Sequence, residues 1–291
     1  MKVLRAGLLL AIVSTALPRP AAAYVRYYTE RNAPFFWSER TLPITAYVSG
    51  FNQPAMTTDQ VLNAVTAAAE TWSAAQNDCT YMTIQIWASN DPAPRAVNDA
   101  HNALIFRSAS WCQLAADGSC DVDYDSSALA FTWDTANRNT GQIYDADIEV
   151  NLVDFKWADV VAAPQLAADM DLQNAVTHEM GHFLGLDHTC YDPESPGTRV
   201  RPTDNTGAPV PDCMAASADV RETTMYPSAM PGDTQKRTLA PDDRAGVCGI
   251  YPSDHPPPDG NMRGGCTACA VSEGSPAPAA TALAALLVAA A

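Results

Sequence analysis

Residues 178–188 read HEMGHFLGLDH and hold three of the five histidines in the chain. On a helix with 3.6 residues per turn, His178 and His182 project from the same face one turn apart, so both imidazoles can reach one metal ion. Glu179 is offset by about 100° from His178, which puts its carboxylate beside that ion rather than on it. The pattern predicts a metal site with an adjacent general base.

His188 follows His182 by six positions and would face a different side of a continuous helix. We therefore predict that Gly185 ends the helix in the left-handed conformation and that the chain returns His188 as a third ligand. Three neutral nitrogens suit Zn²⁺, and a fourth position left to water is the catalytic arrangement. Satisfied surface or core histidines are the alternative for H-E-x-x-H alone, but the added glycine and third histidine favour zinc.

The segment resembles the H-E-x-x-H-x-x-G-x-x-H motif of the metzincin zinc endopeptidases. That family carries a methionine turn beneath the zinc, and the downstream sequence ETTMYPS supplies Met225. LGLDHT followed by MYP resembles the matrixin (matrix-metalloproteinase-like) branch, because Pro227 stands where astacin-like and serralysin-like members have a tyrosine that reaches zinc. The resemblance implies that Tyr226 and Pro227 help to form the substrate pocket.

This resemblance extends from about Leu42 to Tyr251, although outside the zinc motif it is one of pattern. It implies an α/β (α+β) zincin-like domain: a twisted, mostly parallel sheet with an antiparallel edge strand, an active-site helix, the methionine turn and a C-terminal helix. Phe131 and Asp147 stand where animal matrixins place histidines for a structural zinc, so one catalytic zinc is expected. No cysteine-switch prodomain is expected either.

The resemblance also implies a mechanism, in which Glu179 accepts the proton of a zinc-activated water and passes it to the leaving amine. The peptide would lie extended along the edge strand near residues 128–132. Asp187 could orient the turn that carries the third ligand through hydrogen bonds, and a solvated surface carboxylate is the alternative. Two other functions stay open: a zinc hydrolase of a non-peptide amide, and an inactive metzincin-like surface binding protein. The presence of Glu179 argues against the second.

The pattern of apolar residues predicts the other elements. A stripe at helical spacing from Val61 to Trp72 indicates a helix over 58–75, with Thr57 or Thr58 as its cap. The helix that carries the first two histidines is expected over 169–184, and a closing helix is expected after Thr238 as its cap. Strands are expected at 42–48, 80–88, 103–108, 128–134 and 143–151.

Residues 1–23 have the charged start, apolar run and small-residue end of a secretory signal peptide. Export would place the eight cysteines in an oxidising compartment. Six of them lie in the body and allow 15 connectivities. Proximity in sequence favours Cys112 with Cys120 and Cys190 with Cys213, which leaves Cys79 with Cys248.

The proposed catalytic domain spans 24–252, and a Pro/Gly-rich linker follows at 253–265. Residues 266–291 contain a C-x-x-C pair and an apolar run, and resemble the C-terminal sorting tail of myxobacteria. Such tails imply processing and surface display, so membrane contact is expected only through this segment. A disordered, low-complexity end is the alternative.

The formal charge of −16 argues against nucleic acid as a partner. We expect a secreted, monomeric chain whose partner is a protein or peptide substrate. An acidic loop at 115–127 carries Asp117, Asp121, Asp123 and Asp125. Calcium, which takes clustered carboxylates, and a solvated acidic surface are both open interpretations.

Overall fold

The computed structural model describes residues 23–53, 55–74, 77–91, 94–193, 200–254 and the backbone of a strand at 280–289. The expected signal peptide, apart from Ala23, lies outside these residues. So do most of the linker and the Cys266–Cys269 pair.

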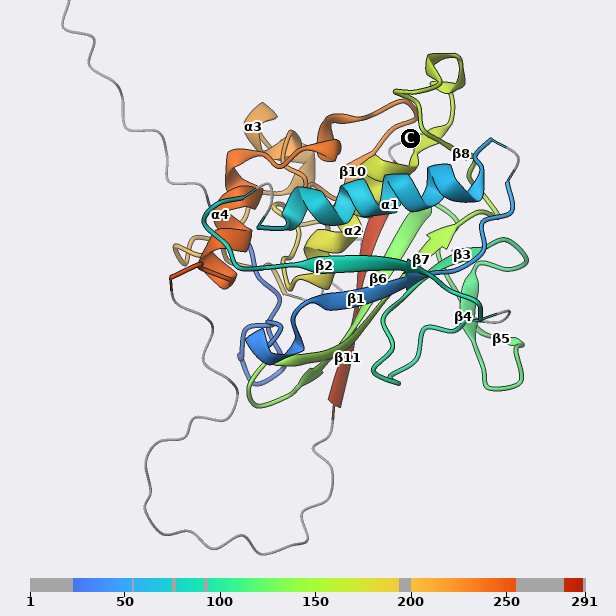
Figure 1. Ribbon diagram of the computed structural model, residues 1–291. Coiled ribbons are helices and arrows are strands. Elements are labelled where there is room, and N and C mark those ends of the chain that lie inside the picture. Colours follow the sequence, from blue (N-terminus) through green and yellow to red (C-terminus); the bar gives the residue numbers. More distant parts are fainter. Residues whose placement is uncertain are drawn as a thin grey trace, which may run out of the picture.

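The described residues form a mixed α/β fold (Figure 1). Its α-helices are α1 (Thr58–Trp72), α2 (Leu172–Phe183), α3 (Ala218–Arg221) and α4 (Pro241–Ile250). Its short 3-10 helices span Glu39–Thr41, Pro164–Leu166, Cys213–Ala215 and Gln235–Arg237. Its strands are β1 (Ile44–Val48), β2 (Ile84–Ala88), β3 (Ala103–Arg107), β4 (Cys112–Leu114), β5 (Cys120–Asp123), β6 (Ala128–Asn137), β7 (Ile143–Asn151), β8 (Trp157–Ala158), β9 (Met170–Asp171), β10 (Ser228–Ala229) and β11 (Ala280–Ala289).

The central sheet has seven strands in the order β10-β11-β6-β7-β3-β1-β2. Strands β2, β1, β3 and β7 run parallel, and β6 runs antiparallel to β7. The expectation of a mostly parallel sheet with an antiparallel strand is confirmed. The expectation that this strand lies at the edge is wrong, because β11 pairs with its outer side.

Local interactions set the ends of the elements. Thr57 and Gln60 form a reciprocal capping box at the start of α1. The helix ends at Trp72 rather than residue 75, and the Asn77 side chain donates to the carbonyls of Thr71 and Ser73 at that end. Strand β1 starts at Ile44, two residues later than expected, after a proline that has no N–H to give to the ladder.

The cap expected at Thr238 is wrong. Helix α4 has Ala240 at its N-cap position and begins with Pro241. The carboxylate of Asp243 accepts the Ala240 N–H at 3.0 Å, which supplies the bond that a capping side chain would have made.

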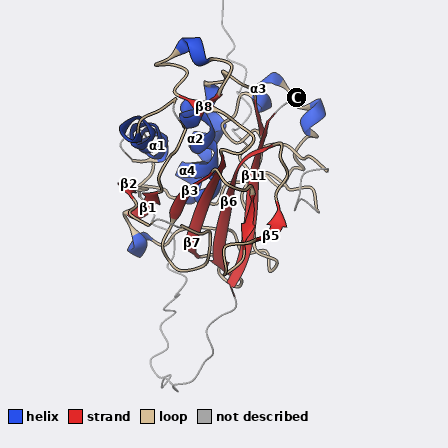
Figure 2. Ribbon diagram, turned by 90° about the vertical axis from the view of Figure 1, so that its right-hand side faces the viewer, coloured by secondary structure: helices blue, strands red, loops and turns tan. Residues whose placement is uncertain are grey.

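One face of the sheet is covered by α1 and α2, which lie next to each other (Figures 1 and 2). The predicted stripe of α1 is buried, from Val61 to Trp72, and the Trp72 indole donates to the carbonyl of Thr177 on α2 at 2.8 Å. This bond ties the first helix to the one that carries the metal-site histidines.

The opposite face of β6 holds a small aromatic cluster. Phe131 packs against Trp111 and Tyr124, with ring centroids 5.4 and 4.6 Å away. Asp147, the other position compared with a structural-zinc ligand, accepts the backbone N–H groups of Val97 and Ala103. Both residues therefore have structural roles of their own.

The acidic loop forms a hairpin of β4 and β5 that the sequence reading missed. Asp117 and Asp125 each accept hydrogen bonds from a serine two positions later, Ser119 and Ser127. Within the described residues, the loop brings no three carboxylates within reach of one ion. Calcium binding there stays a prediction without a carboxylate cluster to support it.

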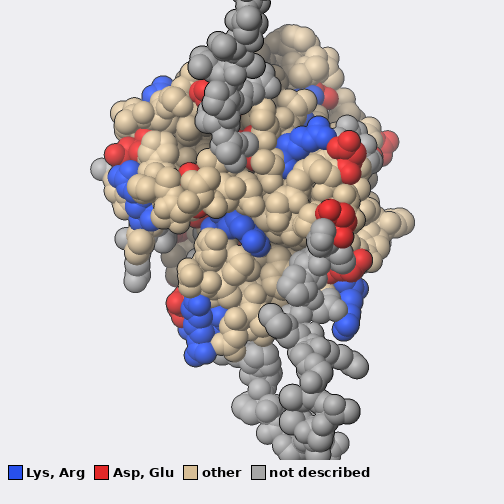
Figure 3. All heavy atoms as spheres, turned by 90° about the vertical axis from the view of Figure 1, so that its left-hand side faces the viewer, with Lys and Arg blue, Asp and Glu red and all other residues tan. Residues whose placement is uncertain are grey.

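All three expected disulfides are present. Cys79–Cys248, Cys112–Cys120 and Cys190–Cys213 have Cα–Cα distances of 5.3, 5.6 and 4.9 Å. They indicate an oxidising environment outside the cytoplasm. Among the helices of the described ranges, none combines the length and apolarity that crossing a membrane requires. On the face drawn in Figure 3, basic side chains occur in separate small groups rather than as one surface.

Candidate metal centre

The three predicted histidines converge on one point. The Nε2 atoms of His178, His182 and His188 lie 3.0, 3.1 and 3.3 Å from one another. Nitrogens that share a tetrahedral zinc at 2.0–2.1 Å are about 3.3 Å apart. The three side chains therefore form a group that can hold a metal ion, with a spacing compatible with zinc.

The other ring nitrogen of two histidines is held by a backbone carbonyl. His178 Nδ1 lies 2.6 Å from Thr224 O, and His182 Nδ1 lies 2.9 Å from Leu186 O. A carbonyl can only accept, so each Nδ1 carries the proton and each Nε2 presents its lone pair. Burial lowers the pKa of His178 well below its usual value and that of His182 to about 3, which keeps both rings neutral.

Helix α2 ends as the sequence predicted. Gly185 has φ +89°, its N–H donates to His182 O, and the N–H of Leu186 donates to Gly181 O. These two bonds define a Schellman motif, with glycine at the left-handed position. The motif reverses the chain and brings His188 back toward the first two ligands.

The turn at Gly185 also packs against the N-terminal segment. A Cβ placed on Gly185 would lie 2.8 Å from the carbonyl oxygen of Phe35. Backbone bonds from Tyr27 N to Gly185 O and from Asp187 N to Val25 O fix the two segments together. Glycine is thus needed here for its conformation and for the close approach.

The segment of the third ligand is anchored on both sides. Asp187 Oδ1 accepts the N–H of His188 at 2.7 Å, and the Tyr27 hydroxyl donates to the same carboxyl. Burial raises the Asp187 pKa to about 7. The orienting role suggested for Asp187 fits these contacts.

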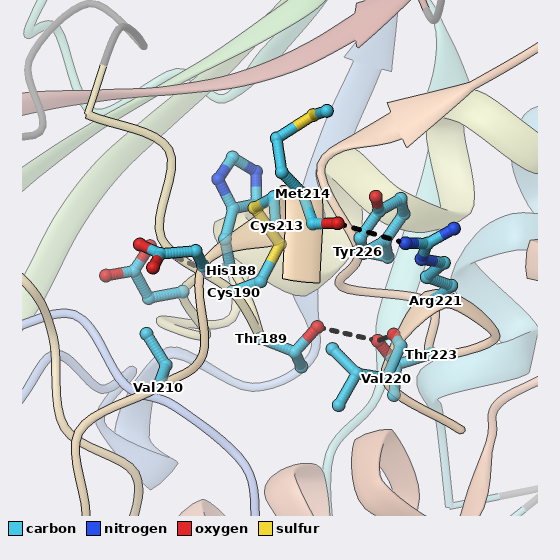
Figure 4. The surroundings of a disulfide bond; sticks show 12 residues. His188, Thr189, Cys190, Val210, Cys213, Met214, Val220, Arg221, Thr223 and Tyr226 are labelled. Carbon is cyan, nitrogen blue, oxygen red and sulfur yellow. Dashed lines mark hydrogen bonds between the residues drawn. A yellow bond between two sulfur atoms is a disulfide. The ribbon is translucent and has the colours of Figure 1, made fainter. Parts of the chain in front are cut away.

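After His188, the chain is tied to the segment before the methionine turn (Figure 4). Thr189 N donates to Met225 O, and the Thr189 hydroxyl bonds that of Thr223 at 2.8 Å. The Cys190–Cys213 disulfide follows directly. Together these links fix the direction in which the third imidazole points.

Glu179 is fully buried, and its carboxylate is held from the sheet. The Thr132 hydroxyl on β6 donates to Glu179 Oε2 at 2.6 Å. The sequence reading did not find Thr132, because only the packing of β6 against α2 reveals the contact. A signal was present, because Thr132 is the one polar residue within the otherwise apolar run ALAFTW at 128–133.

Met225, the residue expected to form the methionine turn, packs against α2. A Cβ on Gly181 would lie 2.1 Å from the Met225 sulfur, so the thioether packs directly on the helix between the two histidines. Asp243 of α4 accepts the N–H groups of Thr224 and Met225 at 2.7 and 3.1 Å. The sequence reading missed Asp243, although its place in the first turn of α4 marked it as a capping residue.

Tyr226 and Pro227, the two residues expected in the substrate pocket, directly follow Met225 in the chain. Tyr226 is half-buried and Pro227 is buried, directly before β10. The Lys236 ammonium donates to the Tyr226 carbonyl and lies 3.3 Å from His178 Nδ1. Burial lowers the Lys236 pKa to about 7. Lys236 is a third residue that the sequence reading missed, after Thr132 and Asp243.

Asp134 is the fourth residue that the sequence reading missed. Its side chain is buried on β6 and neither carboxyl oxygen has a hydrogen-bond partner. Burial, together with the negative charges of Asp145, Glu179 and Asp147, raises its pKa well above the usual value. A protonated, uncharged Asp134 is the consequence.

Comparisons with known proteins add no relative: no protein-family model matches the chain, and the search of curated proteins found no match. The assignment of a function depends on the residues described above.

Proposed function

We propose that the chain is a secreted zinc-dependent endopeptidase of the metzincin type, most similar to the matrixin branch. The observation that carries the proposal is the convergence of the three Nε2 atoms of His178, His182 and His188, with Glu179 buried on the same helix directly after the first of them. A third ligand supplied by a glycine-ended helix distinguishes this arrangement from enzymes with only H-E-x-x-H.

The three histidines would hold one zinc ion, which when bound supplies Lewis acidity to a water molecule and to the scissile carbonyl. Glu179 would accept the proton of the attacking water and pass it to the leaving amine. Thr132 orients the Glu179 carboxylate by donating to its Oε2. The carbonyls of Thr224 and Leu186 hold the protons of His178 and His182 on Nδ1, which leaves each Nε2 available to a metal.

The peptide would lie extended along the side of β6 that β11 occupies in the structure, where backbone N–H and C=O groups can pair with it once β11 has left. Tyr226 and Pro227, between Met225 and β10, would form part of the wall that selects substrate side chains. The three disulfides support an extracellular site of action.

The test uses the full mature chain, loaded with one equivalent of zinc and incubated with casein. We expect cleavage that a chelator abolishes and added zinc restores. Glu179→Gln should keep the zinc content and lower the rate by at least about 10²-fold, because it removes the general base. Glu70→Gln, at an exposed position of α1, is the matched control and should leave the rate unchanged.

Cleavage that survives the chelator or Glu179→Gln would refute the proposal. Full zinc binding with no casein cleavage, and turnover only of small non-peptide amides, would favour the other hydrolase function. Zinc binding without any hydrolysis, both in the unaltered chain and in chains with substitutions in residues 280–289, would favour a binding protein.

A further inference from the structure

A strand from the C-terminal tail fills the space between β6 and β10. Strand β11 pairs antiparallel with β6, from Ala280 opposite Asn137 to Val288 opposite Ala128, and its last residues pair parallel with β10. Figures 1 and 2 show β11 running along the outer side of β6. If β11 were absent, the outer N–H and C=O groups of β6 would have no strand partner, a state that favours binding of an extended chain.

This slot between β6 and β10 passes the candidate metal centre. Ala285 lies opposite Thr132, the residue whose hydroxyl holds Glu179. Strand β11 also contacts α2, the helix that carries two of the metal ligands. On its other side β10 begins three residues after Met225. A chain in the slot is therefore bordered by the elements that hold the base and the metal ligands.

We propose that residues 280–289 are an internal occupant of the peptide-binding slot and compete there with peptide substrates. The inference depends on the proposed function, because it treats the slot as the place where substrate binds. Backbone pairing on both sides of the segment is the pairing that an added peptide strand would make. The free enzyme would then be the minor form, in which the tail has left the slot.

The occupant also indicates the class of ligand. Its sequence, ATALAALLVA, contains no charged side chain and one polar side chain, that of Thr281. An extended, uncharged, aliphatic peptide held through its main chain is therefore the ligand class that the slot accepts. Because the segment is tethered, its effective concentration is on the order of millimolar, so weak intrinsic binding is sufficient for high occupancy.

The decisive variant is Ala284→Pro/Ala285→Pro in the full chain. Neighbouring positions of a strand alternate in their pairing, so at least one proline removes a donor to β6, and neither proline fits a central strand. Ser275→Pro/Ala277→Pro, outside the paired residues, is the matched control. Equal zinc content and intact disulfides in all chains establish that the body is folded.

The first readout does not depend on catalysis. A dye-labelled peptide ATALAALLVA with two added lysines is titrated with each chain, and anisotropy gives its Kd. If the tail occupies the slot in about nine molecules of ten, Ala284→Pro/Ala285→Pro should bind the peptide about tenfold more tightly than the unaltered chain and the control. Hydrogen exchange should become faster in β6 in this variant alone. Equal affinities, or unprotected outer amides of β6 in the unaltered chain, would overturn the proposal.

The second readout is the initial rate on a quenched aliphatic peptide, with substrate below KM. The rate should rise by the same factor of about ten in the proline variant, while the intact mass of every chain stays constant. An unchanged rate despite tighter peptide binding would overturn competition. Loss of residues within 280–289 would make the segment a substrate instead of a lasting occupant, and would also overturn the proposal.

Failure of the two proposals can be told apart. Tighter peptide binding by the proline variant with no hydrolysis by any chain would refute the peptidase and leave the occupied slot. Equal binding and equal, chelator-sensitive hydrolysis by all chains would refute the internal occupant and leave the peptidase. If the proline variant does not fold, a site-specific protease sequence placed at Gly264–Gly265 and cut after folding gives the same comparison, because dilution then releases the segment.

Discussion

Substituting Gly185 by alanine tests the geometry of the helix end most directly. The residue has φ +89°, where an alanine side chain costs about 1–2 kcal/mol. Alanine recovers about 0.4–1 kcal/mol by restricting the unfolded chain. The new Cβ would also lie 2.8 Å from the carbonyl oxygen of Phe35, and forcing that contact apart costs about 1–3 kcal/mol. We expect Gly185→Ala to lower the free energy of unfolding by about 1–5 kcal/mol.

Gly207→Ala separates the two causes. Gly207 has φ +85° but no atom within 4 Å of a new Cβ, so only the conformational cost applies there. The difference between the two variants, about 1–3 kcal/mol, then measures the contact with Phe35. Urea unfolding of the metal-free chain, with the disulfides intact, gives both values.

The same change should reach the metal site. If the turn shifts to relieve the contact, His188 moves relative to the other two ligands, and zinc affinity measured by chelator competition should fall about 10- to 100-fold. Gly207→Ala should leave that affinity unchanged. Equal unfolding free energies for the two alanine variants, or unaltered zinc affinity in Gly185→Ala, would refute the account of this turn.

Three further predictions concern buried polar residues. Thr132→Val removes the bond to Glu179 and should lower kcat about 10- to 100-fold with no change in zinc content, since a hydrogen bond to a charged group contributes about 1.5–3 kcal/mol; an unchanged kcat would exclude the positioning role. Asp243→Asn can no longer accept the backbone N–H groups of both Thr224 and Met225, so the free energy of unfolding from thermal melts should fall by about 1–3 kcal/mol. An unchanged free energy of unfolding would contradict the role of that carboxylate. Asp134 stays protonated in the folded chain while it ionises in the unfolded chain above about pH 4, so the parent protein loses stability as the pH rises. The free energy of unfolding of Asp134→Asn should therefore rise relative to that of the parent by up to about 1.4 kcal/mol per pH unit above about pH 4. If this difference between variant and parent does not change between about pH 4 and 8, the Asp134 carboxyl is already ionised in the folded chain.

Local sequence was sufficient to predict the cluster of three histidines and the end of the helix. The spacing of His178, His182 and His188 requires a reversal at Gly185, and that reversal is a property of one turn and its glycine. The three disulfides were also within reach, because two of them close short separations of 8 and 23 residues. The third then followed by elimination.

The residues that hold Glu179 and the Met225 segment in place could not be predicted from local sequence patterns. Thr132 and Asp243 lie 47 and 18 residues from the groups that they hold, so only the packing of whole elements reveals them. Residues 280–289 were read as an apolar end because a run of alanine and leucine has no alternation of period two. Their partner, the outer edge of β6, becomes visible only when the sheet is assembled.

The Cys190–Cys213 disulfide starts two residues after His188, so its formation or reduction affects the segment that carries this candidate metal ligand. Reduction would leave the segment after His188 held by hydrogen bonds alone, such as those of Thr189 to Met225 and Thr223. On the proposed function, the chain with this disulfide reduced would therefore bind zinc more weakly than the same chain with the disulfide formed. If the chain is the secreted peptidase proposed above, its metal site would mature only in an oxidising compartment, away from the proteins of the cytosol.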